Sequence, residues 1–206
     1  MATKASKGEK TGEEQAAKDR KVVVGIDLGT YRTVVLSDKG DKLSMRSTVG
    51  YPKDIISRKL VGDGPLFGPE AIEKRNYLDL CFPLAEGVIK EASDRDYQAA
   101  TELVRHVVEL VRKGGEAEVC GIIGVPARAS VMNKELLLKV AREVMDSALV
   151  VSEPFMAAYS LNKLNKCIVI DIGAGTVDIC CMKGSIPTSE DQVTTFKGGD
   201  YIDERL

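Results

Sequence analysis

Apolar runs separated by glycine, proline and charged residues divide the chain into short strands and amphipathic helices. Strand-like runs occupy residues 21–27, 33–37 and 43–49, where β-branched residues follow one another without helical spacing. Turn residues separate the three runs, so we expect an antiparallel meander at the start of the fold. The same order of run, turn and run returns at residues 167–183 and 192–196.

Helical spacing is clearest between the two meanders. Residues 96–112 place apolar side chains on one face behind the cap signal Ser93-Asp94, which predicts a long amphipathic helix. Residues 55–83 are irregular apart from one short helix. The remaining expected elements are a loop at 50–54, the short helix at 69–76, strands at 119–125 and 149–152, helices at 133–147 and 154–162, a turn at 198–200 and the start of a helix at 201–206.

This order of elements predicts two related α/β domains. Residues 1–20 carry no large aliphatic side chain after Met1, so we expect a disordered tail. A first domain with a small inserted subdomain follows at 21–162, and a second begins at 163–206. The second would be incomplete, with an open sheet edge and uncovered apolar surface. We therefore expect the front portion of a longer protein or a truncated relative.

Composition narrows the class of protein. The chain has 206 residues, 44% of them hydrophobic and 29% charged, with a formal net charge of −2, which is typical of a globular protein and gives no support to nucleic-acid binding. Its five cysteines lack paired C-x-x-C spacing, which argues against a zinc site or a disulfide framework. No apolar run approaches about eighteen residues, so we expect no membrane insertion. The single histidine, His106, is interpreted as structural.

Two glycine turns carry the candidate chemistry. Asp171 ends an apolar run and precedes Gly173-Ala174-Gly175-Thr176, and Asp27 ends an earlier run before Gly29-Thr30. Backbone amides in such turns can cradle an anion, and a carboxylate can hold a divalent metal. A strand follows each turn, so neither the Rossmann nor the Walker A pattern fits. One copy is compatible with a plain β-hairpin. Two copies favour a cleft that grips a nucleoside triphosphate.

Glu153 is the third candidate acid. It ends an apolar strand and precedes Pro154 at a helix start, so its carboxylate points into the crevice where α/β proteins bind ligands. The alternative is stabilisation of the helix dipole, which contributes only about 0.3–1 kcal/mol. Asp178 alternates with buried positions on a strand and is interpreted as structural. Asp94 and Asp96 are interpreted as capping and surface charges.

The two glycine motifs resemble the phosphate motifs of the actin, sugar kinase and heat-shock chaperone superfamily. The resemblance covers residues 21–206 and implies the actin-like ATPase fold of duplicated ribonuclease H-like domains, with the second domain incomplete. Segments 67–71, 83–89 and 152–159 resemble bacterial actins, the MreB group among them. Within that group, the segments most similar to the magnetosome actins are 49–54, 93–96, 123–130, 149–155 and 198–206.

This resemblance implies that ATP and Mg²⁺ lie between the two halves and that water attacks the γ-phosphate. Glu153 and Asp171 would be catalytic, and Asp27 and Asp171 would contact the metal. The nucleotide-binding residues implied by the family are Asp27, Gly29, Thr30, Tyr31, Gly173, Gly175, Thr176, Gly198 and Gly199.

The resemblance also implies a cytoplasmic cytoskeletal protein that self-associates into filaments or co-assembles with a full-length bacterial actin, with magnetosome-associated proteins as partners. Three alternatives remain open: the nucleotide domain of a chaperone, a small-molecule kinase, and a truncated paralogue that binds filaments without turnover. The superfamily's adenosine motif falls outside the sequence. We therefore expect residues 1–206 to bind ATP weakly or not at all and to aggregate.

Overall fold

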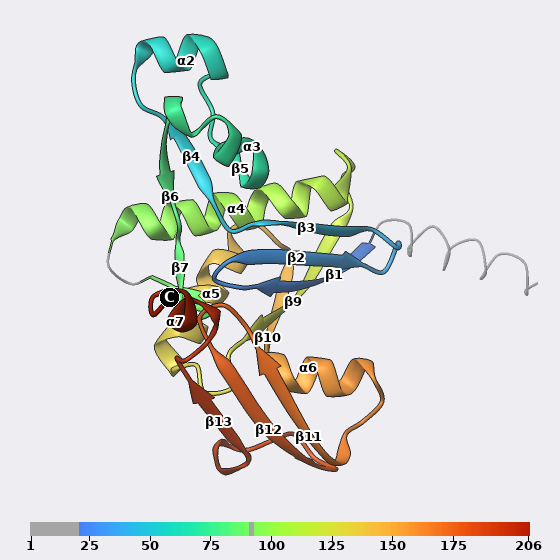
Figure 1. Ribbon diagram of the computed structural model, residues 1–206. Helices are drawn as coiled ribbons and strands as arrows, with labels where there is room; N and C mark the ends of the chain where they lie inside the picture. The colour runs from blue at the N-terminus through green and yellow to red at the C-terminus, as the bar shows by residue number, and fades with distance from the viewer. Residues whose placement is uncertain (1–20, 91–92) are drawn as a thin grey trace, which may run out of the picture.

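Five strands form the main sheet in the order β10-β9-β1-β2-β3. The computed structural model describes residues 21–90 and 93–206 (Figure 1), so the predicted tail at 1–20 lies outside the described residues. β1 pairs antiparallel with β2 and parallel with β9, which confirms the predicted opening meander. The strands are β1 (Lys21–Leu28), β2 (Arg32–Ser37), β3 (Lys42–Arg46), β9 (Glu118–Val125) and β10 (Ser147–Ser152).

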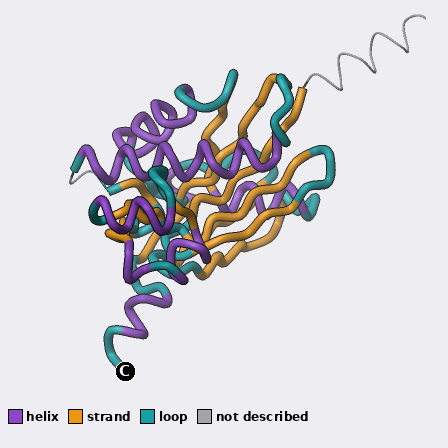
Figure 2. Tube along the Cα trace, turned by 90° about the horizontal axis from the view of Figure 1, so that it is seen from above, coloured by secondary structure: helices purple, strands orange, loops and turns teal. Residues whose placement is uncertain are grey.

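Two helices cover one face of this sheet, and the longer one runs beside the strands in Figure 2. The Ser93 hydroxyl accepts the Asp96 N–H at 3.2 Å, so the predicted helix start is confirmed. Apolar side chains of the helices, such as Leu103 and Val140, form one buried core with Ile26 of β1. The helices are α4 (Asp94–Arg112) and α5 (Val131–Arg142).

A separate three-stranded sheet and its helices follow β3, and we call residues 49–81 the small subdomain. The prediction of one strand at 43–49 is wrong, because the Thr48 N–H bonds back to the last carbonyl of β3 at 2.8 Å and Val49 starts a strand in another sheet. Gly50, expected in a loop, lies in that strand and pairs with Leu80. Glycine is needed there because a Cβ would meet Leu78 Cδ1 at 2.7 Å. The subdomain contains β4 (Val49–Pro52), β5 (Leu66–Phe67), α3 (Gly68–Glu73), the 3₁₀ turn η1 (Arg75–Tyr77) and β6 (Leu78–Cys81).

The subdomain also contains a helix that sequence reasoning missed, α2 (Ile55–Val61). The Asp54 carboxylate caps it by accepting the Ser57 N–H at 2.7 Å. Ile55 and Ile56 are exposed, so the helix has no core-facing apolar stripe that could have revealed it.

Helix boundaries elsewhere differ by a few residues from the predictions. The helix expected at 133–147 is α5, which starts earlier because Ser130 and Asn133 form a capping box, and it ends at Arg142. A short hairpin precedes α4, and α6 follows β10 directly. These elements are β7 (Leu84–Ala85), β8 (Val88–Ile89) and α6 (Glu153–Ser160).

A second, three-stranded sheet lies beside the first, in the order β11-β12-β13 (Figure 1), and confirms the predicted second meander. One of its faces packs on α6, where Ala158, Cys180 and Met182 form a small buried cluster. All five cysteines are free thiols. The elements are β11 (Asn165–Ile172), β12 (Val177–Lys183), the 3₁₀ turn η2 (Ser189–Asp191), β13 (Gln192–Thr195) and α7 (Gly199–Asp203).

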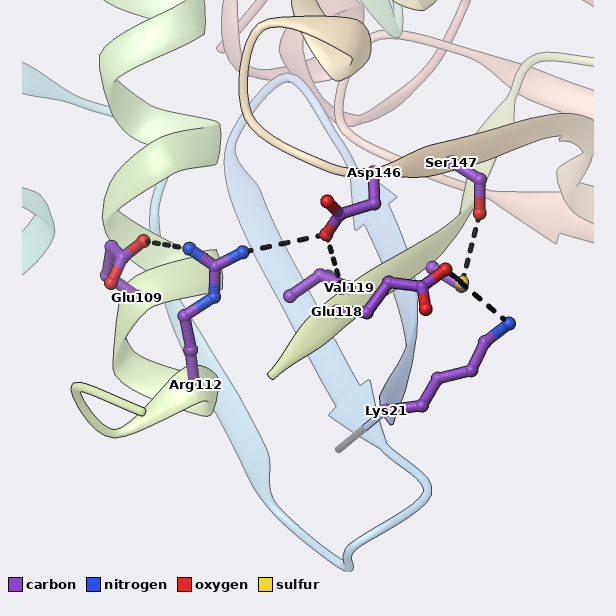
Figure 3. A network of polar contacts seen from close by, with 8 residues as sticks. Lys21, Glu109, Arg112, Glu118, Val119, Asp146 and Ser147 are labelled. Carbon is purple, nitrogen blue, oxygen red and sulfur yellow. Dashed lines mark hydrogen bonds and ion pairs between the residues drawn. The ribbon is translucent and has the colours of Figure 1, made fainter. Parts of the chain in front are cut away.

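Polar contacts tie α4 to the amino ends of β9 and β10 (Figure 3). The Arg112 guanidinium lies 3.1 Å from Glu109 and 3.8 Å from Asp146, and the Asp146 carboxylate accepts the Val119 N–H at 2.7 Å. These bonds fix one end of the sheet, while the carboxyl ends of β1, β9 and β10 lie at the other. None of the helices in the described part of the chain is long and apolar enough to cross a membrane.

Candidate functional site

A cavity of about 310 Å³ opens between the two glycine turns. Every residue implied for the nucleotide or for catalysis lines it, except Gly198 and Gly199. The predicted residues on its wall are Asp27, Gly29, Thr30, Tyr31, Glu153, Asp171, Gly173, Gly175 and Thr176.

The two turns are built alike. Leu28 pairs with Thr33 across the first hairpin, and Ile172 pairs with Val177 across the second, so both hairpins have the same connection length. The preceding aspartates, Asp27 and Asp171, therefore occupy equivalent positions near the ends of β1 and β11. The sequence repeat is thus a repeat in structure.

Glycine is required where the turns meet. A Cβ on Gly175 would lie 2.6 Å from Thr30 Oγ1 and 2.9 Å from Glu86 Cα. Real Cβ atoms do not approach so closely, so any side chain here would push the two turns apart. The backbone amides can consequently reach a ligand in the cavity from both sides.

Glu153 reaches the cavity from the end of β10. It is the first residue of α6, and a Cβ placed on Gly124 of β9 would lie 2.9 Å from its Cγ. Burial and neighbouring negative charges raise the pKa of Glu153 to about 8. In decreasing order of effect, these charges belong to Asp27, Asp171 and Asp178.

The other two carboxyl groups share this environment. Burial, then the charge of Asp171, raises the pKa of Asp27, and burial, then the charge of Asp178, raises the pKa of Asp171. Such crowding of negative charge favours a bound cation. Among the described residues, no three ligand side chains lie close enough to hold one ion. Magnesium commonly takes only one or two carboxylates plus water and phosphate oxygens, so this site fits Mg²⁺.

Gly198 and Gly199 lie behind the second turn. The Gly199 N–H donates to the Gly173 carbonyl at 3.0 Å, and a Cβ on Gly198 would lie 2.4 Å from the Ala174 carbonyl oxygen. Their contact is with the turn itself. Tyr31 lines the cavity while its ring lies 3.7 Å from the Arg46 guanidinium.

Sequence reasoning missed the part that the β7–β8 hairpin plays in this site. Gly87 lines the cavity, and its N–H donates to Thr30 Oγ1 at 2.8 Å. Glu86 and Gly87 have φ values of 52° and 72°, as a tight hairpin turn requires. The Glu86-Gly87 pair between two short apolar runs was the sequence signal that could have revealed this hairpin turn.

His106 stacks on Phe67 at 4.1 Å and is not among the residues lining the cavity.

A protein-family model and individual known proteins both match most of this chain. The family model for MreB/Mbl protein matches residues 21–206. The actin-like protein MamK of Magnetospirillum gryphiswaldense is 52% identical over 200 residues, which is 97% of this chain and 56% of that protein.

Two solved structures are also similar. One is a MamK double helical filament, with a TM-score of 0.86 and 54% identity over 90% of this chain and 57% of that one. The other is a non-polymerising MamK mutant bound to AMPPNP, with a TM-score of 0.77 and 54% identity over 90% and 57% of the two chains. The chain thus spans little more than half the length of these relatives.

Proposed function

The chain belongs to the MreB/Mbl protein family, and on that premise we propose that it is part of an actin-like filament protein that binds ATP with Mg²⁺ between its two glycine turns. The similarity to MamK confirms the resemblance to the magnetosome actins and the actin-like α/β fold. It does not favour the chaperone or kinase alternatives.

One observation carries the nucleotide proposal. Two equivalent strand-Asp-turn-strand units converge on one cavity, and a third carboxylate, Glu153, enters it from the end of β10. A plain hairpin needs neither the repeat nor the shared carboxylates. The MamK structure bound to AMPPNP, a nucleotide analogue, supports the same assignment for this chain.

In the proposed mechanism, the amides of the two turns bind the β- and γ-phosphates from opposite sides. Asp27 and Asp171 would hold Mg²⁺, which when bound neutralises charge on the phosphate oxygens. With the neighbouring negative charges offset by bound Mg²⁺, Glu153 would ionise, accept a hydrogen bond from the attacking water and take its proton. The new bond from the water oxygen to the γ-phosphorus forms in line with the breaking bond to the ADP oxygen.

We further propose that residues 21–162 and 163–206 belong to two domains of the filament subunit. Its partners are further copies of itself or a full-length bacterial actin, in a magnetosome-associated cytoskeletal filament in the cytoplasm. The filament of the MamK relative supports this proposal. Co-sedimentation of the chain with M. gryphiswaldense MamK, with and without ATP, tests it, and recovery of the chain only in the supernatant would contradict it.

Nucleotide binding is tested by NMR titration of the full chain with Mg·ATP and with Mg·tripolyphosphate. We expect weak binding, with Kd near 1 mM or about −4 kcal/mol, and shifts of the Gly29, Gly173 and Gly175 amides. Asp171→Asn should weaken binding of the magnesium complexes about tenfold, since it removes a carboxylate proposed to hold Mg²⁺. Asp63→Asn, on the exposed surface of the small subdomain, is the control. Equal binding by both variants would refute the assignment of Asp171.

The catalytic part of the proposal is tested by Glu153→Ala in a filament-forming full-length subunit. Phosphate release should fall by about two orders of magnitude or more, as is usual for loss of a residue that positions or deprotonates the nucleophile. Release at the wild-type rate would remove Glu153 from the mechanism.

A further inference from the structure

One buried carboxylate is not among the residues that line the cavity. Asp178 lies on β12 with 1% of its surface exposed. Its Oδ1 accepts the backbone N–H of Ala127 at 2.8 Å and the hydroxyl of Thr194 at 2.5 Å. A buried charge is tolerated only with such partners, so these bonds account for its presence.

The bonds join the two sheets. Ala127 and Arg128 follow β9 of the five-stranded sheet, whereas Asp178 and Thr194 face each other on β12 and β13. The Arg128 N–H donates to Thr194 Oγ1 at 3.0 Å, in the region where Figure 1 shows the chain from β9 passing beside β13. Because a hydroxyl can accept and donate at once, Thr194 accepts the Arg128 N–H and donates its own hydrogen to Asp178.

Comparison of the repeats shows that the hairpin itself needs no charge here. The shared register places Asp178 where the first repeat has Val34, and Thr194 where it has Ser44. The first hairpin forms the same pairs without an acid. The acid is therefore explained by its contact with the loop after β9 and not by the strand pairing.

We propose that Asp178 and Thr194 form a clasp that fixes the angle between the two sheets and so positions the phosphate cavity. Asp178 lies directly opposite Asp171 across β11 and β12. The loop that it holds follows β9, on which a Cβ at Gly124 would lie 2.9 Å from Glu153 Cγ. The clasp thus connects the carboxylates contributed by the two halves, and Asp178 acts as a positioning residue through its acceptor oxygen.

The clasp is tested without nucleotide by hydrogen exchange with mass spectrometry on the full chain. Thr194→Val removes the hydroxyl while keeping the side-chain volume, and exchange at the Ala127 and Arg128 amides should rise about tenfold. Thr195→Val, the neighbouring change on β13, is the matched control and should leave both amides protected. Unchanged exchange in Thr194→Val would overturn the clasp.

Asp178→Asn separates positioning from a role for the charge. The amide oxygen still accepts both bonds, so exchange at Ala127 and affinity for Mg·tripolyphosphate should remain within about threefold of wild type. Thr194→Val should weaken that affinity about tenfold by releasing the angle between the sheets. If Asp178→Asn abolishes binding while Ala127 stays protected, the carboxylate acts by its charge and the positioning role is wrong.

The positioning role rests on the proposed function, and the two can fail separately. Wild-type protein that binds no phosphate ligand would refute nucleotide binding, and the exchange data would still decide whether the clasp exists. Faster exchange in Thr194→Val with unchanged phosphate affinity would leave a clasp that does not position the cavity, which contradicts the proposal.

Discussion

The two meanders of this chain share strand order, turn length and the aspartate before the turn, yet their equivalent side chains have opposite environments. Val24 and Ile26 of β1 are 0% exposed, while Ile168 and Ile170 of β11 are 64% and 61% exposed. Leu28 and Ile172 continue the contrast at 3% and 72%. Local sequence therefore sets the strand and its turn, and the helices that pack on the strand decide which face is buried.

The covering helices account for the difference. α4 and α5 form a large core with β1, whereas α6 packs on the opposite face of the second sheet, where Cys167 and Val169 lie. No helix in the described residues covers Ile168, Ile170 and Ile172. Exposed isoleucines on a three-stranded sheet with open edges are features that favour association, and the aggregation expected from the sequence stays a prediction.

The largest difference between the repeats is expected from serine substitutions at matched positions. Ile26→Ser buries an unpaired hydroxyl and leaves a cavity, so it should lower the free energy of unfolding by about 4 kcal/mol. Ile170→Ser should change it by less than about 0.5 kcal/mol and reduce turbidity, because this side chain already faces water. Urea unfolding of both variants measures the effect. Equal losses would show that the second face is covered in solution.

The next largest effect concerns Glu153, where the two repeats meet. Its carboxyl keeps a proton in the folded protein up to a pKa of about 8, whereas in the unfolded chain it ionises near 4.5. The stability that the protonated carboxyl contributes to the folded state is therefore fully present below about pH 4.5 and is lost as the pH rises through 8. Glu153→Gln should be more stable than wild type at pH 9, by less than the limit of roughly 5 kcal/mol that the separation of the two pKa values sets, and similar at pH 5.

Thermal unfolding of Glu153→Gln between pH 5 and 9 checks this expectation, with the exposed Glu73→Gln as control. Relative to the variant, wild type should lose stability as the pH rises from 5 to 9. Added Mg²⁺ should restore part of that lost stability at high pH. A constant difference between the two proteins at every pH would mean that the carboxyl is not buried among other negative charges.

The glycines of the two turns should also differ. A Cβ on Gly29 would lie 2.8 Å from the Arg32 carbonyl oxygen, whereas on Gly173 the nearest atom would be 3.4 Å away. Gly29→Ala should therefore cost about 1–3 kcal/mol, because backbone must move, and Gly173→Ala should cost less than about 0.5 kcal/mol. Chemical denaturation compares them, and equal costs would indicate that the first turn yields easily.

The strands, the repeat and the lining of the cavity could be predicted because each depends on local pattern. Asp27 and Asp171 stand at the ends of apolar runs, and the glycines follow at fixed spacing. Gly50 misled the prediction because glycine is needed there for close packing against Leu78, a residue far away in the sequence, and not for a turn. Gly87 was missed for a related reason, since its bond to Thr30 joins segments far apart in sequence.

The smallest expected difference lies at the caps of the covering helices. Ser93 Oγ accepts an N–H in the first turn of α4, while Ser152, at the same position of α6, makes no side-chain cap bond. Ser93→Ala should therefore cost about 1 kcal/mol and Ser152→Ala close to nothing. Thermal unfolding measures the cost of both substitutions, and hydrogen exchange at the Asp96 amide reports on the Ser93 cap. A greater cost for Ser152→Ala would show that the second repeat depends on its helix start more than the first, which reverses the order expected from the cap bonds.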